Sequence, residues 1–216
     1  MTNTAKKSKK IFSIFAKIFS VFFVVICAIV IFFNLTHEYH IVSGTSMLPT
    51  LNNNSTDGVF VSKIKKYSRG DIIVVDKGEK NDSGEEIFVI KRLIAIAGDK
   101  IKIEEYDGYA RIFLIYENDT QETILDEPYL NSYENNTFLK TNFDNMKNNM
   151  GFEVDSLGYI TIPENQIFFL GDNRKSSNDC SIYGPKSKDN VVGKVDYIAY
   201  GNKHLYWQVI KQFLGV

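Results

Sequence analysis

An uninterrupted apolar segment near the amino terminus constrains this chain more than any other feature. Residues 11–33 contain one charge, Lys17, and neither proline nor glycine. As an α-helix, a segment of this length would span roughly 34 Å, which exceeds a hydrocarbon core of about 30 Å. Lys17 lies near the amino end of the segment, where its side chain can reach the membrane interface. We therefore predict a single transmembrane anchor.

Two other interpretations of this segment are a cleaved signal peptide and a buried core helix. The apolar run is longer than a usual signal-peptide core, and no pair of small residues suited to cleavage follows it. Lysines precede the segment and acidic residues follow it, so the positive-inside rule places residues 1–10 in the cytoplasm as a basic tail. The rest of the chain is then expected outside the cytoplasm, at a cell membrane.

The composition excludes several classes of protein. The 216 residues are 44% hydrophobic and 24% charged, as expected for a chain with a packed core. Five lysines precede the first acidic residue, Glu38, so the 20 remaining basic and 26 acidic residues leave a formal charge of −6 beyond the anchor. We expect no nucleic-acid partner. Cys27 and Cys180 are the only cysteines, which excludes a disulfide scaffold and a four-thiolate zinc site.

The histidines do not form a recognisable metal motif. His37 and His40 flank Glu38 but lie three positions apart, whereas the H-E-x-x-H zinc motif places its histidines four apart. We therefore expect neither a metal nor another cofactor.

Short apolar stretches separated by turn residues predict an antiparallel, mostly β fold for the exported part. They are rich in Val, Ile, Phe and Tyr, and glycine or Asn and Asp positions separate most of them. Residues 126–155 are rich in asparagine and lack a regular apolar period, which favours an exposed insertion or cap of irregular structure. Residues 204–216 are expected to form a short amphipathic helix. The predicted strands are 59–64, 71–76, 86–98, 100–106, 110–116, 159–163, 166–172 and 191–200.

Two loops hold polar side chains with possible functional roles. In residues 42–51, VSGTSMLPTL, Ser46 lies directly before an apolar methionine, although a merely solvated loop serine would look the same. Residues 171–184 could be a solvated turn or a hydrogen-bonding platform that fixes a neighbouring strand. This second loop crowds together the polar residues Asp172, Arg174, Ser176, Ser177 and Asp179.

Lys91 lies inside an apolar predicted strand. By two-residue alternation its side chain shares a face with Val89 and Leu93, whereas Arg92 points to the opposite face. An edge-strand lysine that reaches solvent is one interpretation. If the face is buried instead, desolvation must lower the lysine pKa from about 10.4, and a neutral lysine can act as a general base.

Together these stretches resemble the type I signal peptidases, the membrane-anchored Ser/Lys endopeptidases that remove signal peptides from exported proteins. The similar segments follow an amino-terminal anchor in the family's order and cover most of the chain. They are SGTSMLPTL (43–51), GDIIVV (70–75), IKRLIAIAGDKI (90–101), DEPYL (126–130), YITIPENQIFFLGDNR (159–174) and VVGKV (191–195). The resemblance implies a mostly β catalytic domain, residues 36–103 and 158–216, with a smaller variable β extension, residues 104–157.

The resemblance also implies a role for each matching residue. Ser46 matches the nucleophile, Lys91 the general base and Ser177 the serine that orients the lysine amine. The backbone N–H of Ser46 is the implied oxyanion donor, because the family's side-chain donor would fall at Gly44, which has no hydroxyl. The implied substrate-binding residues are Val42, Met47, Leu51 and Ile90, and the implied structural residues near the site are Arg92, Asp172, Arg174 and Asp179.

One departure from the family pattern is Asp179-Cys180-Ser181, where the family usually has Asp-Ser-Arg. We expect Arg174 or Arg92 to offset the missing arginine. The departure also suggests a divergent branch, such as the paralogues that work with surface-pilus assembly, in which the chain could be a tethered assembly protein that needs no catalysis. A self-cleaving repressor-type Ser/Lys peptidase fits less well, because it would carry a DNA-binding domain in place of the anchor.

The partners follow from the same resemblance. It implies signal peptides of exported bacterial precursors as substrates, contact with membrane lipid, and components of the export machinery or of pilus assembly as further partners.

Overall fold

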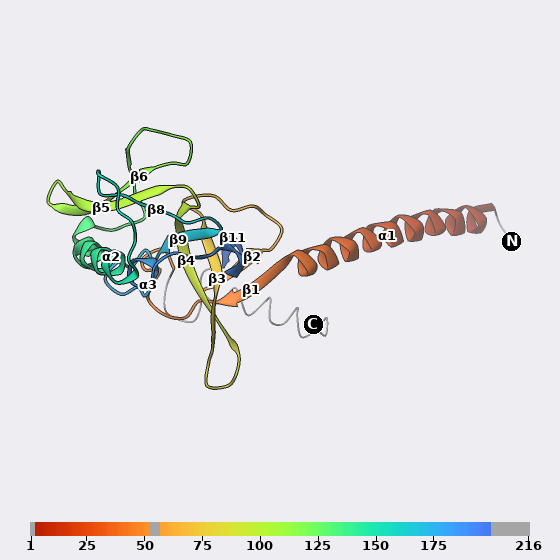
Figure 1. The fold of residues 1–216 in the computed structure, drawn as a ribbon. Helices are drawn as coiled ribbons and strands as arrows, with labels where there is room; N and C mark the ends of the chain where they lie inside the picture. Colours follow the sequence, from red (N-terminus) through yellow and green to blue (C-terminus); the bar gives the residue numbers. More distant parts are fainter. Residues whose placement is uncertain (1–2, 52–56, 200–216) are drawn as a thin grey trace. The chain divides into compact units, whose positions relative to one another are not determined.

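The computed structural model describes residues 3–51 and 57–199, and the chain divides into two compact units, Met1–Glu38 and Tyr39–Val216 (Figure 1). The first unit contains the helix α1 (Asn3–Thr36), which includes the predicted anchor. Its part from Lys10 to Thr36 contains an 18-residue stretch with a mean hydropathy of 2.9, so it is long and apolar enough to cross a membrane by length and composition. The predicted helix at 204–216 lies outside the described residues.

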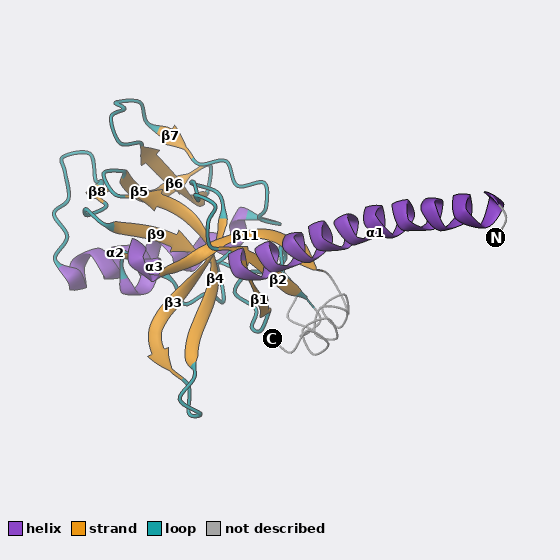
Figure 2. Cartoon of the chain, turned by 90° about the vertical axis from the view of Figure 1, so that its right-hand side faces the viewer, coloured by secondary structure: helices purple, strands orange, loops and turns teal. Residues whose placement is uncertain are grey.

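The second unit is built on two sheets (Figure 2). The pairings of β2 to β11 within these sheets are antiparallel. The larger sheet has the order β1 (His37–Ile41), β2 (Gly58–Ser62), β11 (Val191–Ala199), β3 (Ile72–Lys80), β4 (Glu86–Ile96), β9 (Gln166–Leu170) and β10 (Lys186–Ser187). The smaller sheet has the order β7 (Thr123–Ile124), β6 (Tyr109–Ile115), β5 (Lys100–Tyr106) and β8 (Ile160–Thr161). Short helical segments connect the strands: η1 (Tyr133–Asn136), α2 (Thr137–Met150), α3 (Cys180–Tyr183) and η2 (Lys188–Asn190).

The mostly β fold predicted from the sequence is confirmed. Each of the eight predicted strands coincides with an observed one, with ends that differ by a few residues. The sequence analysis did not predict β1, β7 or β10, of which the last two are only two residues long.

Strand β3 shows why apolar residues form a continuous run in this sheet. Ile73 and Val75 belong to a large apolar cluster together with Leu93 of β4, whereas Val74, between them, belongs to a second cluster with Val42. Because both faces of β3 are covered, the strand is apolar at every position from 72 to 75 rather than at alternate ones. The smaller cluster lies under the candidate site described below.

The prediction of irregular structure between residues 126 and 155 is wrong for α2. This helix buries Leu139, Phe143 and Met146, a spacing of four and three residues that places them on one helix face. Phe143 packs edge-on against Phe168 of β9, with ring centroids 6.0 Å apart. The helix ends at Gly151, whose φ of 65° is the left-handed conformation typical of a helix C-cap. Tertiary packing of this apolar face outweighs the low helix propensity of the asparagines.

Candidate active site

A pocket of about 230 Å³ brings Ser46 and Lys91 together. One wall is formed by residues from the segment 40–47, which includes Ser46, and the other by residues 88–91 of β4, with Val74 of β3. The two residues are 45 positions apart in the sequence, so the sheet is what places them at one cavity.

The turn that carries Ser46 is held by its own backbone and by the apolar cluster beneath it. Leu48 N–H donates to the Thr45 carbonyl at 3.1 Å, and Leu51 N–H donates to the Met47 carbonyl at 2.9 Å. Val42, Met47 and Leu51 are buried in the smaller cluster. Of the four predicted substrate-binding residues, Val42, Met47 and Ile90 line the pocket, whereas Leu51 lies in the cluster but not in the pocket lining.

Lys91 is a buried lysine on β4. Its side chain is only 3% exposed, and it faces Ile73 of β3 across the sheet, so the interpretation as a solvent-reaching edge lysine is wrong. Within residues 3–51 and 57–199 it forms neither an ion pair nor a hydrogen bond through its amine. Burial lowers the pKa of Lys91 from its ordinary value of 10.5, although the nearby Asp179 and Asp172 carboxylates and the Cys180 thiol oppose that shift.

Ser46 has free hydrogen-bonding capacity. Its carbonyl accepts a hydrogen bond from Asn173 N–H at 2.9 Å, but neither its hydroxyl nor its N–H is hydrogen-bonded to a described residue. The Ser46 hydroxyl and the Lys91 amine therefore share the pocket without a hydrogen bond between them. Catalytic hydrogen bonds in free enzymes are often long and shorten only when substrate binds.

The loop of residues 171–177 meets the Ser46 turn at Gly171. A Cβ atom at this glycine would lie 2.2 Å from Ser177 Oγ and 2.4 Å from the Ser46 carbonyl oxygen, so no side chain fits there. Asn173 further ties the two segments together, because its Nδ2 donates to the Thr45 carbonyl at 2.9 Å. Ser177 Oγ is buried and has no hydrogen-bond partner among the described residues, which leaves it available to a group in the site.

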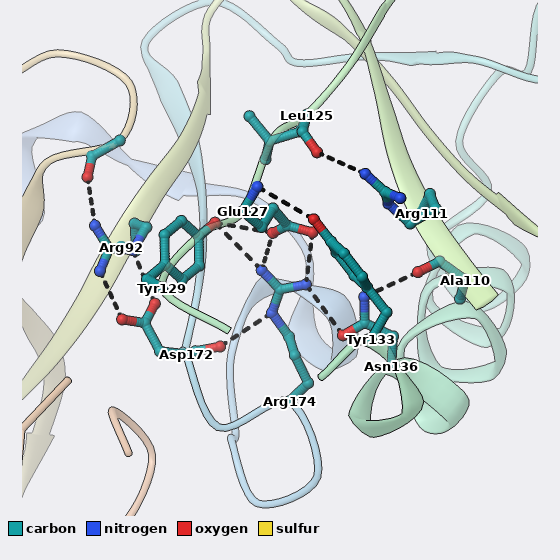
Figure 3. A network of polar contacts seen from close by, with 12 residues as sticks. Arg92, Ala110, Arg111, Leu125, Glu127, Tyr129, Tyr133, Asn136, Asp172 and Arg174 are labelled. Carbon is teal, nitrogen blue, oxygen red and sulfur yellow. Dashed lines mark hydrogen bonds and ion pairs between the residues drawn. The ribbon is translucent and has the colours of Figure 1, made fainter. Parts of the chain in front are cut away.

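Arg92 and Asp172 link β4 to the Ser46 turn (Figure 3). Arg92 donates through Nε and Nη2 to the two carboxylate oxygens of Asp172, at 2.8 and 2.6 Å. Asp172 Oδ2 also accepts from the Thr50 hydroxyl at 2.5 Å. This paired geometry is the strong, directional form of an arginine–carboxylate contact, and it fixes the Ser46 turn to the strand that carries Lys91.

The expected offset for the arginine missing after Asp179 is wrong. Arg92 pairs with Asp172, and Arg174 pairs with Glu127, so neither forms an ion pair with Asp179. Instead Asp179 accepts hydrogen bonds from Gly171 N–H at 2.9 Å, Ser181 N–H at 3.1 Å and Ser181 Oγ at 2.8 Å. Ser181, at the position where the resemblance implies arginine, thus donates hydrogen bonds to the Asp179 carboxylate. Asp179 also caps the N-terminus of α3.

Gly44, the position at which the resemblance implies a side-chain oxyanion donor, lines the pocket. Its φ of 93° lies in the left-handed region, although a Cβ there would contact nothing within 4 Å. A residue with a side chain would be strained at this backbone conformation. The turn therefore favours glycine, which has no hydroxyl to offer.

His40 and Phe88 are among the pocket residues that the sequence did not predict as part of the site. Their rings meet edge-on with centroids 5.2 Å apart. The signal for His40 was its position two residues before Val42, since alternate residues of an extended segment share a face. Among residues 3–51 and 57–199 no three His, Cys, Asp or Glu side chains gather as a metal site would require.

Comparison with known proteins identifies the family. Residues 14–200 match the family described as "Signal peptidase, peptidase S26". This chain belongs to the signal peptidase family S26. Signal peptidase I of Bacillus caldolyticus is 30% identical over 196 residues, which cover 88% of this chain and 90% of that protein. The relation holds over nearly the whole of both sequences.

Other relatives of this signal peptidase family member are also bacterial. Signal peptidase I S of Bacillus subtilis (strain 168) is 28% identical over 77% of this chain and 79% of that protein. Signal peptidase IB of Staphylococcus aureus (strain Mu50 / ATCC 700699) is 28% identical over 72% of this chain and 74% of that protein. The predicted resemblance to type I signal peptidases is confirmed. The apolar helix α1, taken with these relatives, indicates a membrane-anchored protein.

Proposed function

We propose that this chain is an active endopeptidase that removes signal peptides from exported precursors with a Ser46–Lys91 dyad. The observation that carries the proposal is the placement of Lys91, a buried cationic side chain without a carboxylate partner among the described residues, at the same pocket as Ser46. Desolvation without an ion pair is the condition under which a lysine can be neutral near neutral pH and accept a proton.

The chemistry follows from these groups. The neutral Lys91 amine takes the proton from the Ser46 hydroxyl as Ser46 Oγ attacks the carbonyl carbon of the scissile peptide bond. The unbonded N–H of Ser46 donates to the oxyanion that forms. The Lys91 ammonium then protonates the leaving amine, the C–N bond breaks, and a Ser46 ester remains. A water deprotonated by Lys91 hydrolyses this ester and restores the enzyme.

Ser177 supports the proposed base. Its buried hydroxyl has no partner among the described residues and lies beside Gly171, where the Ser46 turn and the 171–177 loop meet. In the proposal this hydroxyl accepts a hydrogen bond from the Lys91 amine and orients its lone pair toward Ser46 Oγ. The Ser46–Lys91 hydrogen bond forms when substrate fills the pocket and displaces water from it.

The pocket and the edge of β4 suit an extended substrate with small apolar side chains. Val42, Met47 and Ile90 give the pocket apolar walls, and its volume is about 230 Å³. The pairing of β4 with β9 begins at Arg92, so among the described strands residues 86–91 pair only with β3. A substrate backbone can add to that open edge as a further strand, which places its side chains alternately into the pocket and away from it.

The proposal also includes the topology. Residues 1–10 lie in the cytoplasm, α1 crosses the membrane, and the catalytic part lies outside, where exported precursors emerge. Residues 36–103 and 158–216 form the catalytic domain, and residues 104–157 form the extension.

Cleavage of a signal-peptide precursor by the full chain in detergent tests this function. Wild-type protein should cleave, while Ser46→Ala and Lys91→Ala should lose activity by about 10³-fold or more, because each removes one half of the dyad. Lys175→Ala is the matched control, since Lys175 is exposed in the loop of residues 171–177. The mechanism is wrong if Ser46→Ala cuts at the wild-type rate.

The tethered assembly function makes the opposite prediction in cells. It was suggested by Cys180, Ser181 and Gly44, the positions that depart from the family pattern. A strain depleted of this protein should regain normal secretion and surface pili with the wild-type gene but not with Ser46→Ala. Full rescue by Ser46→Ala would favour the assembly function over catalysis.

A further inference from the structure

A buried ion pair connects the segment before α2 to the loop that carries Ser177 (Figure 3). The side chains of Arg174 and Glu127 are 1% and 0% exposed, and Arg174 Nη2 donates to Glu127 Oε1. Arg174 Nη1 reaches Asn136 Oδ1 at 3.4 Å, and Asn136 Nδ2 donates to the Ala110 carbonyl of β6 at 2.8 Å. Arg174 of the 171–177 loop is therefore held by Glu127 and Asn136, which lie in the predicted extension, residues 104–157.

Tyr129 joins this ion pair to Arg92. Its hydroxyl donates to Glu127 Oε1 at 2.8 Å, and its ring lies 3.8 Å from the Arg92 guanidinium carbon, in a cation–π contact. Burial, followed by the Glu127 charge, raises the pKa of Tyr129, so its hydroxyl stays protonated and continues to donate. One tyrosine thus contacts both arginines of the site.

These contacts lead directly to the reacting groups. Arg174 Nε donates to the Gly171 carbonyl at 3.2 Å, and Gly171 is the residue packed against Ser177 Oγ and the Ser46 carbonyl. A second series of contacts begins at Arg92, which donates to Asp172. Asp172 in turn accepts a hydrogen bond from the Thr50 hydroxyl in the Ser46 turn. Glu127 and Tyr129 therefore support both the 171–177 loop and the Ser46 turn. Neither residue lines the pocket itself.

The charges of this network are balanced. Arg92 and Arg174 are matched by Asp172 and Glu127, and Glu127 supplies the only ion pair of Arg174 among the described residues. The other carboxylate whose charge acts on Arg174 is that of Asp179. The same carboxylate, together with Asp172 and the Cys180 thiol, also acts electrostatically on Lys91. Loss of the Glu127 charge would leave Arg174 to act on Asp179 and, through it, on Lys91.

We propose that Glu127 and Tyr129 are positioning residues, which act through Arg174 and Arg92 to hold the 171–177 loop and the Ser46 turn in the geometry that catalysis needs. This inference rests on the proposed function. It gives the segment 126–130, DEPYL, a role at the site although none of its residues touches the substrate pocket.

The test is a kinetic comparison of Glu127→Gln and Tyr129→Phe with wild type, using the full chain in detergent and a signal-peptide precursor. Glu127→Gln keeps the shape of the side chain and removes its charge, and Tyr129→Phe keeps the ring and removes the hydroxyl. We expect kcat to fall about 10- to 100-fold for Glu127→Gln and less for Tyr129→Phe, because displacements of about 1 Å in a site have effects of this size. KM should stay within about twofold, since the pocket lining is unchanged.

The pH profile separates a positioning role from a merely structural one. With the Glu127 charge removed, Arg174 partly neutralises Asp179, which otherwise favours the Lys91 ammonium. The acidic limb of the kcat/KM profile should therefore move to lower pH in Glu127→Gln and stay unchanged in Tyr129→Phe.

Asp99→Asn is the matched control. Asp99 is buried and pairs through both oxygens with Arg69 at 2.6 Å, but it has no contact with the 171–177 loop. This variant should lose stability while it keeps the wild-type kcat and pH profile. The proposal is overturned if both test variants match wild type in kcat and pH profile, or if Asp99→Asn lowers kcat equally at an equal loss of melting temperature.

Two further outcomes are also decisive. If Glu127→Gln does not fold, the comparison of Tyr129→Phe with Asp99→Asn decides, because Tyr129→Phe deletes a single hydroxyl. If Ser46→Ala is as active as wild type in the same assay, the proposed function fails rather than this inference, and the two failures are told apart by that one variant.

Discussion

Lys91 and Arg92 are neighbours on β4, yet their surroundings are opposite. Arg92 points to a carboxylate that accepts two of its hydrogen bonds, and its guanidinium rests on the Tyr129 ring. Lys91 points to an apolar face and has no ion pair among the described residues. A strand's alternation is enough to place one cation in a structural network and the next in a desolvated site.

Arg174 extends the comparison to a cation that is as deeply buried as Lys91. Burial alone would lower the pKa of Arg174, but the Glu127 carboxylate, together with Tyr129 and Asp179, outweighs burial and raises the pKa. Burial without such a partner lowers the pKa of Lys91. The presence or absence of a paired carboxylate therefore separates a buried cation that holds the fold together from one that can exchange a proton.

The largest expected effect comes from removing the ability of residue 91 to lose its proton. Lys91→Arg keeps a long cationic side chain, but a guanidinium stays protonated in proteins. Cleavage of precursor should fall about 10³-fold or more, while the melting temperature changes little. Lys175→Arg, in the exposed part of the 171–177 loop, should cleave as wild type. Substantial activity in Lys91→Arg would break the comparison, because it would mean that residue 91 acts only through its charge.

A smaller effect is expected when the paired cation is changed. Arg92→Lys loses one of the two hydrogen bonds to Asp172 and the flat contact with Tyr129, so stability should fall by about 1–3 kcal/mol in urea unfolding. We expect kcat to fall about tenfold, since the Ser46 turn is held partly through Asp172. An unchanged stability and rate would show that the Arg92–Asp172 pair does not position the site.

Stability should respond to pH in a manner set by Lys91. The unfolded chain keeps the lysine proton up to about pH 10.5, whereas the folded chain releases it at lower pH, so wild-type stability rises with pH between these two values. Below that window the buried ammonium imposes its full penalty. Lys91→Met should therefore melt at higher temperature than wild type, by about 2–4 °C for each kcal/mol gained.

Thermal unfolding measured from about pH 6 to about pH 10 checks this prediction. The advantage of Lys91→Met should shrink as the pH rises through the window. A variant that is less stable than wild type at all pH values would contradict the account, because it would show that the lysine stabilises the fold.

The smallest expected effect is at Ser181. Ser181→Ala removes the hydroxyl that donates to Asp179 and leaves the two backbone N–H donors in place. The loss should be about 0.5–1.5 kcal/mol of stability, with precursor cleavage within about twofold of wild type. A large loss of activity would mean that this hydroxyl, rather than the backbone, controls Asp179 and its effect on Lys91.

The strand face that carries Lys91 could be predicted from the sequence because a local rule governs it, whereas the roles of Ser46 and Lys91 came from the family resemblance. Two-residue alternation placed Lys91 on the face of Leu93, and both are buried. Helix α2 was not predicted because its many asparagines have a low helix propensity. The apolar spacing that forms its buried face was nevertheless present in the sequence, at Leu139, Phe143 and Met146.

The partners of the charged residues could not be predicted in the same way. Arg174 and Glu127 are 47 positions apart, and no local pattern indicates that one faces the other. The expected pairing of Asp179 with Arg174 or Arg92 failed because each arginine has its own carboxylate from another element. Pairings of this kind depend on tertiary structure rather than on a period in the sequence.

The most direct test of the account is the ionisation of Lys91 itself. In the Ser46→Ala protein with isotope-labelled lysines, an NMR titration follows each side-chain amine, and Lys91→Met identifies the signal of residue 91. The account predicts a titration midpoint for Lys91 clearly below the ordinary lysine value of 10.5, with the exposed Lys175 as the internal reference. A midpoint at or above 10.5 would contradict it, because Lys91 would then be charged at neutral pH and unable to take the Ser46 proton.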